Sequence, residues 1–254
     1  MPRPTATAIA RDLAALGVRP GGMLLVHSSL SSMGHVPGGP ETVIQGLLQA
    51  LGDEGTLLLP ALSWELVGPP EWLFDARSTP CCVGAIPEHF RRRPGTLRSV
   101  HPTHSVCGVG PRARWALQDH HLDASPCGPH SPLRRLREAE GQALFLGCGV
   151  TCNTSMHAIE EVVEAPYLFA ETVPCRVIWP DGHESETPLR RHSFAGIQLR
   201  YERLLDLLSE PDEMRRGRVL QADVVLYELA PMWRAARRAF AEDIYYFADR
   251  VGPE

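Results

Sequence analysis

A strand, a helix and a second strand follow one another in residues 23–60, and this order constrains the fold more than any other feature of the sequence. Residues 23–26 and 56–60 are apolar runs typical of buried strands. Residues 41–51 have the apolar spacing of a helix that stops at Gly52. This order predicts a parallel βαβ unit. The serine-rich residues 27–34, which follow the first strand, would then lie at the ligand-binding edge of the sheet.

The serine-rich stretch HSSLSSMG offers hydroxyls and closely spaced backbone N–H groups that suit a phosphate or an amide. It matches neither G-x-x-x-x-G-K-[ST] nor G-x-G-x-x-G, so the motif alone does not indicate a nucleotide site. An ordinary polar turn is the competing interpretation. Taken alone, the stretch favours the ordinary turn.

A second junction between a strand and a helix carries the candidate catalytic residues. Residues 144–149 are typical of a buried strand that ends in glycines. A helix of roughly three turns follows, capped by Asn153 or Thr154. His157 and Glu160 share one face of this helix because they lie at positions i and i+3. A histidine beside a carboxylate can act as a general base near neutral pH, although a solvated histidine on a glutamate-rich helix is the competing interpretation.

Other elements complete an α/β pattern. The apolar spacing predicts further helices at residues 5–16, 84–93, 132–139, 193–209 and 230–248. Ser131 can cap the helix at 132–139. A strand is expected at residues 219–226, and residues 173–179 and 183–188 should form a hairpin whose antiparallel pairing makes the whole sheet mixed.

Charge and composition exclude several classes of function. The formal net charge of −5 argues against a nucleic-acid partner and suits a cationic small molecule. The chain has no lysine, which excludes Schiff-base and P-loop mechanisms that need one. No apolar run is long enough to span a membrane. The 7 cysteines, without a signal-peptide pattern, indicate reduced thiols in a cytoplasmic protein.

Two other segments carry residues that can bind ligands. His101 and His104 have an H-x-x-H spacing, but no HExxH, CxxC or carboxylate at a usual ligand spacing accompanies them, so no metal is expected. Residues 63–80 form an irregular segment longer than an ordinary connection. Its aromatic rings and carboxylates, including Trp64 and Asp75, could line a pocket for a polycation. The alternative, that the tryptophans pin this segment to the core, has equal support.

Five motifs occur in order within residues 23–166. They are VHSSLSSMG at 26–34, the pieces FD, STP and GAIPE within 74–88, RSVHPTHS at 98–105, SPCG and SP within 125–132, and TSMHAIE at 154–160. Together they resemble the antibiotic N-acetyltransferase family typified by aminoglycoside 3-N-acetyltransferases. Five motifs in order are far more specific than any one of them. The C-terminal third of the chain is compatible with the family but less distinctive.

The resemblance implies a fold, an activity and partners. The fold would be a single α/β domain over residues 1–254, with a mixed central β-sheet flanked by helices (α/β/α) and not the GNAT fold. Acetyl-CoA would be the co-substrate, and no metal would be needed. The acceptor would be a small cationic aminoglycoside, acetylated on its 3-amino group by direct transfer, which confers antibiotic resistance. No nucleic acid and no membrane would be involved, and the chain would be a cytoplasmic monomer or homodimer.

The resemblance also implies roles for individual residues. His157 would be the general base, supported by Glu160. Coenzyme A would contact Ser28, Ser29, Leu30, Ser32, Ser99, Val100, His101, Thr103 and Ser131. The acceptor would contact Trp64, Asp75, His104, Glu160 and Glu164.

Four alternatives stay open at this point. Cys152, shortly before His157, permits a ping-pong mechanism through an acyl-cysteine. The chain could instead be an acetyltransferase of a different small amine, or a protein that binds a cationic drug or coenzyme A without turnover. The last alternative is a metal-dependent amidohydrolase that uses His101, His104 and His157.

Overall fold

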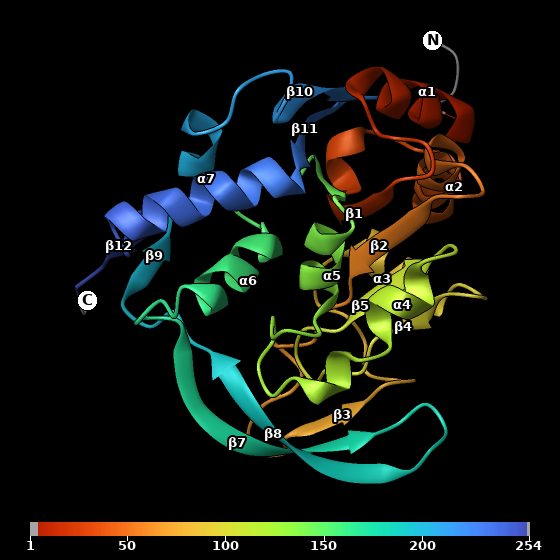
Figure 1. The fold of residues 1–254 in the computed structure, drawn as a ribbon. Coiled ribbons are helices and arrows are strands. Elements are labelled where there is room, and N and C mark those ends of the chain that lie inside the picture. The colour runs from red at the N-terminus through yellow and green to blue at the C-terminus, as the bar shows by residue number, and fades with distance from the viewer. Residues whose placement is uncertain (1–4, 253–254) are drawn as a thin grey trace.

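The computed structural model describes residues 5–252, and its elements are labelled in Figure 1. The α-helices are α1 (Ala6–Leu16), α2 (Gly39–Leu51), α3 (Ala85–Arg92), α4 (Ala113–Leu117), α5 (Pro132–Glu138), α6 (Thr154–Val162) and α7 (Leu229–Glu242). The 3-10 helices are η1 (Ser31–Met33), η2 (His120–Leu122) and η3 (Tyr201–Asp206). The strands are β1 (Met23–Ser28), β2 (Thr56–Pro60), β3 (Leu73–Asp75), β4 (Leu97–Arg98), β5 (Val106–Val109), β6 (Gln142–Leu146), β7 (Phe169–Ile178), β8 (Glu184–His192), β9 (Ile197–Leu199), β10 (Met214–Val219), β11 (Ala222–Glu228) and β12 (Ala248–Arg250).

Seven strands form the central sheet, in the order β10-β11-β6-β1-β2-β5-β4. Strand β1 pairs in parallel with both β2 and β6, which confirms the predicted βαβ unit. Strands β5 and β11 run antiparallel to their inner neighbours, so the sheet is mixed. Almost every residue of β1 and β6 is buried, as expected for strands that are covered on both faces.

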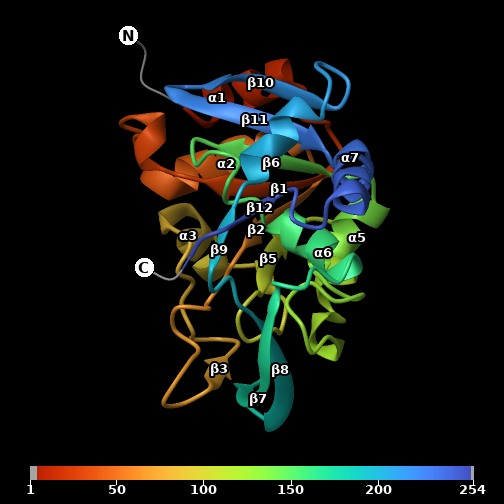
Figure 2. The ribbon, with the colours of Figure 1, turned by 90° about the vertical axis from the view of Figure 1, so that its left-hand side faces the viewer.

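Helices cover both faces of this sheet (Figures 1 and 2). On one face α1, α2 and α3 contribute Ile9, Leu47 and Phe90 to a core that contains Leu24 of β1. On the other face the helices α5, α6 and α7 pack against the alternate side chains of β1 and β6. The predicted α/β/α arrangement is therefore confirmed.

The predicted hairpin at residues 173–179 and 183–188 forms, but it does not belong to the central sheet as expected. Strands β7 and β8 pair with β3 in a separate 3-stranded sheet. Phe74, Cys175 and Leu189 form a separate apolar core, so the apolar side chains of this small sheet are buried without pairing to the central sheet. Antiparallel β5 and β11 make the central sheet mixed instead.

The predicted helix at residues 193–209 is wrong. Residues 197–206 form β9 and η3, and β9 pairs with β12. Gly196 has a φ of 71°, which interrupts a helix at this point. The apolar spacing resembles that of an α-helix because Tyr201 and Leu204 are buried one turn apart in a 3-10 helix, which has an i,i+3 period.

Two other boundaries in the C-terminal part differ from the sequence prediction. The helix predicted at residues 230–248 ends at Glu242, because Ala248–Arg250 pairs with β9. The strand predicted at residues 219–226 is a hairpin of β10 and β11. The remaining predicted helices and strands are confirmed with small shifts of their ends, and the Ser131 side chain caps α5 as expected.

None of the helices within residues 5–252 is long and apolar enough to cross a membrane.

A substitution in β6 tests the centre of the sheet. Leu144 is fully buried between β1 and β11. We expect Leu144→Ala to lower the free energy of unfolding by about 2–5 kcal/mol, because it leaves a cavity in the core. Leu122, which is 59% exposed, provides the control: Leu122→Ala should change stability by less than about 0.5 kcal/mol. Equal urea midpoints for the two variants would contradict this position of β6.

Candidate active site

Two loops meet where the neighbouring parallel strands β1 and β6 end. The two strands are in register, with Ser28 opposite Leu146. The backbone N–H of Ser29 donates to the Leu146 carbonyl at 2.9 Å, and the Ser32 hydroxyl donates to the Gly147 carbonyl at 2.6 Å. A side chain at Gly147 would collide with Ser32, because a Cβ atom there would lie 2.5 Å from the Ser32 Oγ. The serine-rich loop and the loop that leads into α6 are thus locked together.

A cavity of about 360 Å³ opens beside these loops. The serine-rich loop contributes Ser28, and the segment after β6 contributes Cys148, Cys152 and His157. Trp64 also lines the cavity and is 53% exposed. The cavity therefore collects candidate residues from three distant parts of the sequence.

His157 and Glu160 form the pair that their spacing on α6 predicted. The Asn153 side chain caps this helix by accepting from the Ser155 N–H. His157 Nδ1 lies 3.0 Å from Glu160 Oε2, and the Glu160 side chain is fully buried. Because Nδ1 faces the carboxylate, the other ring nitrogen, Nε2, is the one that can exchange a proton in the cavity.

Two tyrosines complete the hydrogen bonds of Glu160. Tyr201 donates to Glu160 Oε2 at 2.7 Å and lies 2.9 Å from His157 Nδ1, while Tyr167 donates to Oε1 at 2.9 Å. Burial, followed by the negative charge of Glu160, raises the pKa of the Tyr201 and Tyr167 hydroxyls, so both remain donors. Neither tyrosine was predicted from the sequence, because no spacing links residues 167 or 201 to α6.

Two further imidazoles surround His157. The ring centroids of His104 and His192 lie 6.3 Å and 5.3 Å from that of His157, and 5.3 Å from each other. His192 Nε2 lies 2.8 Å from a Glu161 oxygen, and both of these side chains are almost completely buried. Burial, and then the charge of nearby histidines, lowers the pKa of His104 and His192 well below 6.5. Both rings are therefore neutral at pH 7.

The serine-rich loop lines a second cavity. Its volume is about 550 Å³, and Ser28, Ser29 and Leu30 are among its walls. Ser28 belongs to both cavities, so the second adjoins the one that contains His157. Of the four residues in this loop that the resemblance assigned to coenzyme A, Ser32 differs because its hydroxyl is used to hold Gly147.

The other residues assigned to coenzyme A lie inside the protein. Ser99, His101, Thr103 and Ser131 are buried, and Val100 packs against the small core of the β3-β7-β8 sheet. The Ser99 hydroxyl lies 2.9 Å from His120 Nδ1, and the Ser131 hydroxyl accepts from the N–H of the helix it caps. None of these five residues lines either cavity, so their contacts with coenzyme A stay a prediction.

The predicted acceptor carboxylates are not brought together. Asp75 pairs with Arg77; burial opposes its ionisation, but hydrogen bonds from Arg77 outweigh burial and lower the pKa of Asp75 to about 2. Glu164 lines a separate cavity of about 530 Å³ beside Glu161 and Arg190. The Glu160 side chain is fully buried and contacts Nδ1 of His157. Their contacts with an acceptor also stay a prediction.

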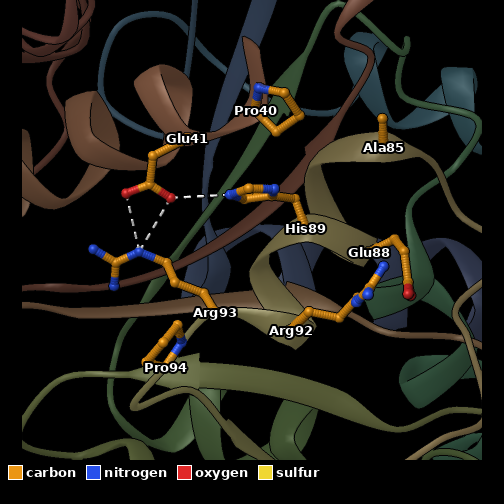
Figure 3. A pocket seen from close by; sticks show the side chains of 8 residues that line it. All are labelled: Pro40, Glu41, Ala85, Glu88, His89, Arg92, Arg93 and Pro94. Carbon is orange, nitrogen blue, oxygen red and sulfur yellow. Dashed lines mark hydrogen bonds and ion pairs between the residues drawn. The ribbon is translucent and has the colours of Figure 1, made fainter. Parts of the chain in front are cut away.

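Another cavity, of about 830 Å³, lies away from His157, between α2 and α3. Figure 3 shows Glu41 reaching both His89 and Arg93 across it, at 3.1 Å and 3.2 Å. No predicted site residue lines this cavity.

Within residues 5–252, no group of three or more His, Cys, Asp or Glu side chains is arranged to hold a metal ion.

Comparison with known proteins identifies the family. A sequence profile described as aminoglycoside 3-N-acetyltransferase matches residues 25–241. Aminoglycoside N(3)-acetyltransferase VIII of Streptomyces fradiae is 36% identical over 253 residues, which cover 89% of this chain and 88% of the relative.

Two solved structures have the same fold. A variant of aminoglycoside acetyltransferase AAC(3)-IVa in complex with a gentamicin superposes with a TM-score of 0.84 and 29% identity, covering 97% of this chain and 92% of that one. The binary complex of AAC-IIIb with CoASH superposes with a TM-score of 0.83 and 28% identity, covering 100% of both chains. The chain belongs to the aminoglycoside 3-N-acetyltransferase family and is an acetyltransferase enzyme.

Proposed function

We propose that the chain transfers the acetyl group of acetyl-CoA directly to the 3-amino group of an aminoglycoside, with His157 as the general base. The contact between His157 Nδ1 and the fully buried Glu160 carries this proposal. The names of the relatives support an aminoglycoside acceptor, and the CoASH complex of AAC-IIIb supports the co-substrate.

The proposed reaction removes two protons from the acceptor nitrogen. An amine that is protonated at neutral pH cannot attack a thioester until it loses the first proton, which Nε2 of His157 accepts and passes to solvent. The free amine then attacks the thioester carbon, Nε2 takes the second N–H proton from the tetrahedral intermediate, and the imidazolium gives that proton to the departing coenzyme thiolate. Glu160 stabilises the imidazolium that forms, because its carboxylate lies 3.0 Å from Nδ1.

The imidazole rings that surround His157 are kept neutral by burial. His104 and His192 are neutral at pH 7, since burial lowers the pKa of each. His27, which also lines the cavity, has a pKa of about 3 because of burial and the charge of His157. A second positive ring is therefore not present to oppose the imidazolium.

Coenzyme A would reach His157 along the serine-rich loop. The cavity beside Ser29 and Leu30 adjoins the one that His157 lines, because Ser28 belongs to both. We propose that the pantetheine arm occupies the cavity beside Ser29 and Leu30 and that the acetyl group enters the cavity that His157 lines. Ser32 would then act indirectly, by fixing the loop to Gly147.

The geometry supports direct transfer over an acyl-cysteine route. Cys152 lines the same cavity as His157, but its hydrogen bonds go to Cys148 and to the Gly149 carbonyl. An acyl-cysteine route in which His157 serves Cys152 as the base needs these two side chains within hydrogen-bond reach. The base proposed here, His157, is instead held by Glu160 and Tyr201.

We also propose that residues 1–254 form one acetyltransferase domain and that the protein is a cytoplasmic monomer or homodimer. The 7 cysteines are free thiols, which supports a reducing compartment.

A panel of amines tests the acceptor. The release of coenzyme A thiol from acetyl-CoA would be followed with gentamicin, apramycin and sisomicin, and the position of the acetyl group would be found by mass and NMR analysis of the product. We expect turnover on at least one aminoglycoside and modification at the 3-amino group. Turnover with simple amines alone would show a different acceptor.

Substitution of the base tests the mechanism. We expect His157→Ala to lower kcat by about 100- to 10,000-fold, since general-base catalysis contributes that much, and to leave the fold intact. His183 provides a matched control because its Nδ1 lies 2.6 Å from the Asp181 carboxylate on the exposed hairpin. His183→Ala should keep full activity. If Cys152→Ser abolished turnover while His157→Ala spared it, direct transfer would be refuted.

Removal of one hydroxyl tests how the base is positioned. Tyr201→Phe removes the donor to Glu160 Oε2 and should lower kcat by about 10- to 100-fold, because a hydrogen bond to a charged group contributes about 1.5–3 kcal/mol. Tyr227→Phe is the control, since the buried Tyr227 hydroxyl has no hydrogen-bond partner within residues 5–252. Equal rates for the two variants would contradict a role for Tyr201.

Buried histidines predict the effect of pH on stability. Burial lowers the pKa of His27 to about 3 and of His120 to about 4, and the pKa of His101, His104 and His192 well below 6.5. Below pH 6.5 the unfolded chain therefore binds protons that the folded chain does not. The stability that these neutral rings provide is complete above pH 6.5 and is lost as the pH falls towards about 4.

The measurement is the urea midpoint between about pH 7 and about pH 5. Each such histidine should contribute a decline of up to about 1.4 kcal/mol per pH unit. His120→Asn removes one of these titrations and should make the decline shallower. A stability that rises as the solution becomes more acidic would exclude this explanation.

A further inference from the structure

Two cysteines form a close pair on the wall of the cavity that contains His157. The sulfur atoms of Cys148 and Cys152 lie 3.1 Å apart, within hydrogen-bond distance for thiols. The Cys152 sulfur also lies 3.1 Å from the Gly149 carbonyl oxygen. Both side chains line the cavity, Cys152 is exposed and Cys148 is half-buried. A reagent in solution can therefore reach this dithiol.

The two thiols have different reactivity. When Cys152 loses its proton, Cys148 can donate its S–H to the thiolate. This hydrogen bond lowers the pKa of Cys152 and raises that of Cys148. Because thiolates are the nucleophiles in disulfide exchange, Cys152 is the attacking group and Cys148 the second thiol.

The other thiols lack these properties. Cys107, Cys127 and Cys175 are buried. Burial raises the pKa of Cys107 to about 12 and of Cys175 to about 11. The half-buried Cys81 also has a pKa of about 11 for the same reason. These thiols are therefore poor nucleophiles near neutral pH.

The loop between β6 and α6 can bring the two sulfurs together. A disulfide needs an S–S distance of about 2.05 Å, so the sulfurs must approach by about 1 Å. Gly149 lies between them in the sequence with a φ of 71°, and the space that a Cβ atom would occupy there is open. The contact of Gly147 with Ser32 and the Asn153 cap hold the two ends of the loop.

We propose that Cys148 and Cys152 form a reactive dithiol site that reduces small-molecule disulfides and closes to an intramolecular disulfide. In the first step the Cys152 thiolate attacks one sulfur of the small disulfide, forms a mixed disulfide and releases one thiolate, which takes a proton from solvent. In the second step Cys148 loses its proton, attacks the Cys152 sulfur and releases the second small thiol. Two protein thiols are oxidised, and one disulfide is reduced to two thiols.

The reaction changes the wall of the cavity and does not depend on acetyl transfer. The S–H groups of both residues disappear from the lining, and the Cys152 contact with the Gly149 carbonyl is lost. Because the proposal concerns thiols alone, it can be tested without measuring acetyltransferase activity. Failure of the acetyltransferase assay would leave it standing.

The test treats the folded, reduced chain with oxidised glutathione, followed by alkylation in denaturant and intact mass analysis. The expected result is two fewer alkylated cysteines than the 7 of the reduced chain, with no glutathione attached, and a Cys148–Cys152 link in the peptide map. Dithiothreitol should restore all the thiols. Seven alkylated cysteines, or a disulfide between Cys81 and Cys82, would overturn the proposal.

Single serine variants test the order of attack. Cys148→Ser should stop at a stable glutathione adduct on Cys152, because the second thiol is missing. Cys152→Ser should react much more slowly, because Cys148 is half-buried and burial still raises the pKa of its thiol. Cys82→Ser is the matched control: Cys82 is half-buried and its thiol donates to the Leu62 carbonyl, so this variant should behave like the unchanged chain.

A second reagent tests the proximity of the sulfurs without oxidation. Phenylarsine oxide bridges two neighbouring thiols with loss of one water. One equivalent should bind the reduced chain and block its reaction with oxidised glutathione, and neither single serine variant at positions 148 and 152 should retain it. Equal retention by Cys148→Ser would overturn the proposal.

Discussion

The rest of the site depends on the hydrogen bonds that satisfy the buried carboxylate of Glu160. A charged group that is fully removed from water is strongly destabilising unless hydrogen bonds satisfy it. Three donors from different elements supply them: His157 on α6, Tyr167 after α6, and Tyr201 on η3. The same contacts fix the ring of His157 and bring η3 against α6. The same hydrogen bonds therefore stabilise the packing of η3 on α6 and position the proposed general base.

The sequence could predict this site only where short spacing sets the geometry. His157 and Glu160 are three residues apart on a capped helix, so their contact follows from helix geometry. Tyr201 joins them across 41 positions. The apolar spacing of its segment predicts a helix because 3-10 and α-helical periods are similar, and the pairing of β9 with β12 depends on residues far along the chain. The prediction of the βαβ unit is confirmed because the apolar runs and the helix signals that define it lie close together in the sequence.

The motif at residues 98–105 forms a series of contacts that ends beside His157. Ser99 binds His120, and the His120 ring stacks on that of His101 at 4.8 Å. His101 in turn accepts from the N–H of His104 at 3.1 Å. This series of contacts places His104 beside His157. The buried members of the motif therefore pack together and hold the segment that carries His104.

The position of the cavity follows from the directions in which the chain leaves two neighbouring strands. After β1 the chain leads to α2, whose Val43 and Leu47 belong to the core on one face of the sheet. After β6 it leads to α6, whose Met156 and Ile159 belong to the core on the other face. Because β1 and β6 are parallel neighbours, their loops start together, held by the hydrogen bonds of Ser29 and Ser32, and then diverge towards opposite faces of the sheet, which leaves a crevice at the carboxyl edge. His157 lies at the start of α6 and so faces this crevice, where the serine-rich loop forms the opposite wall.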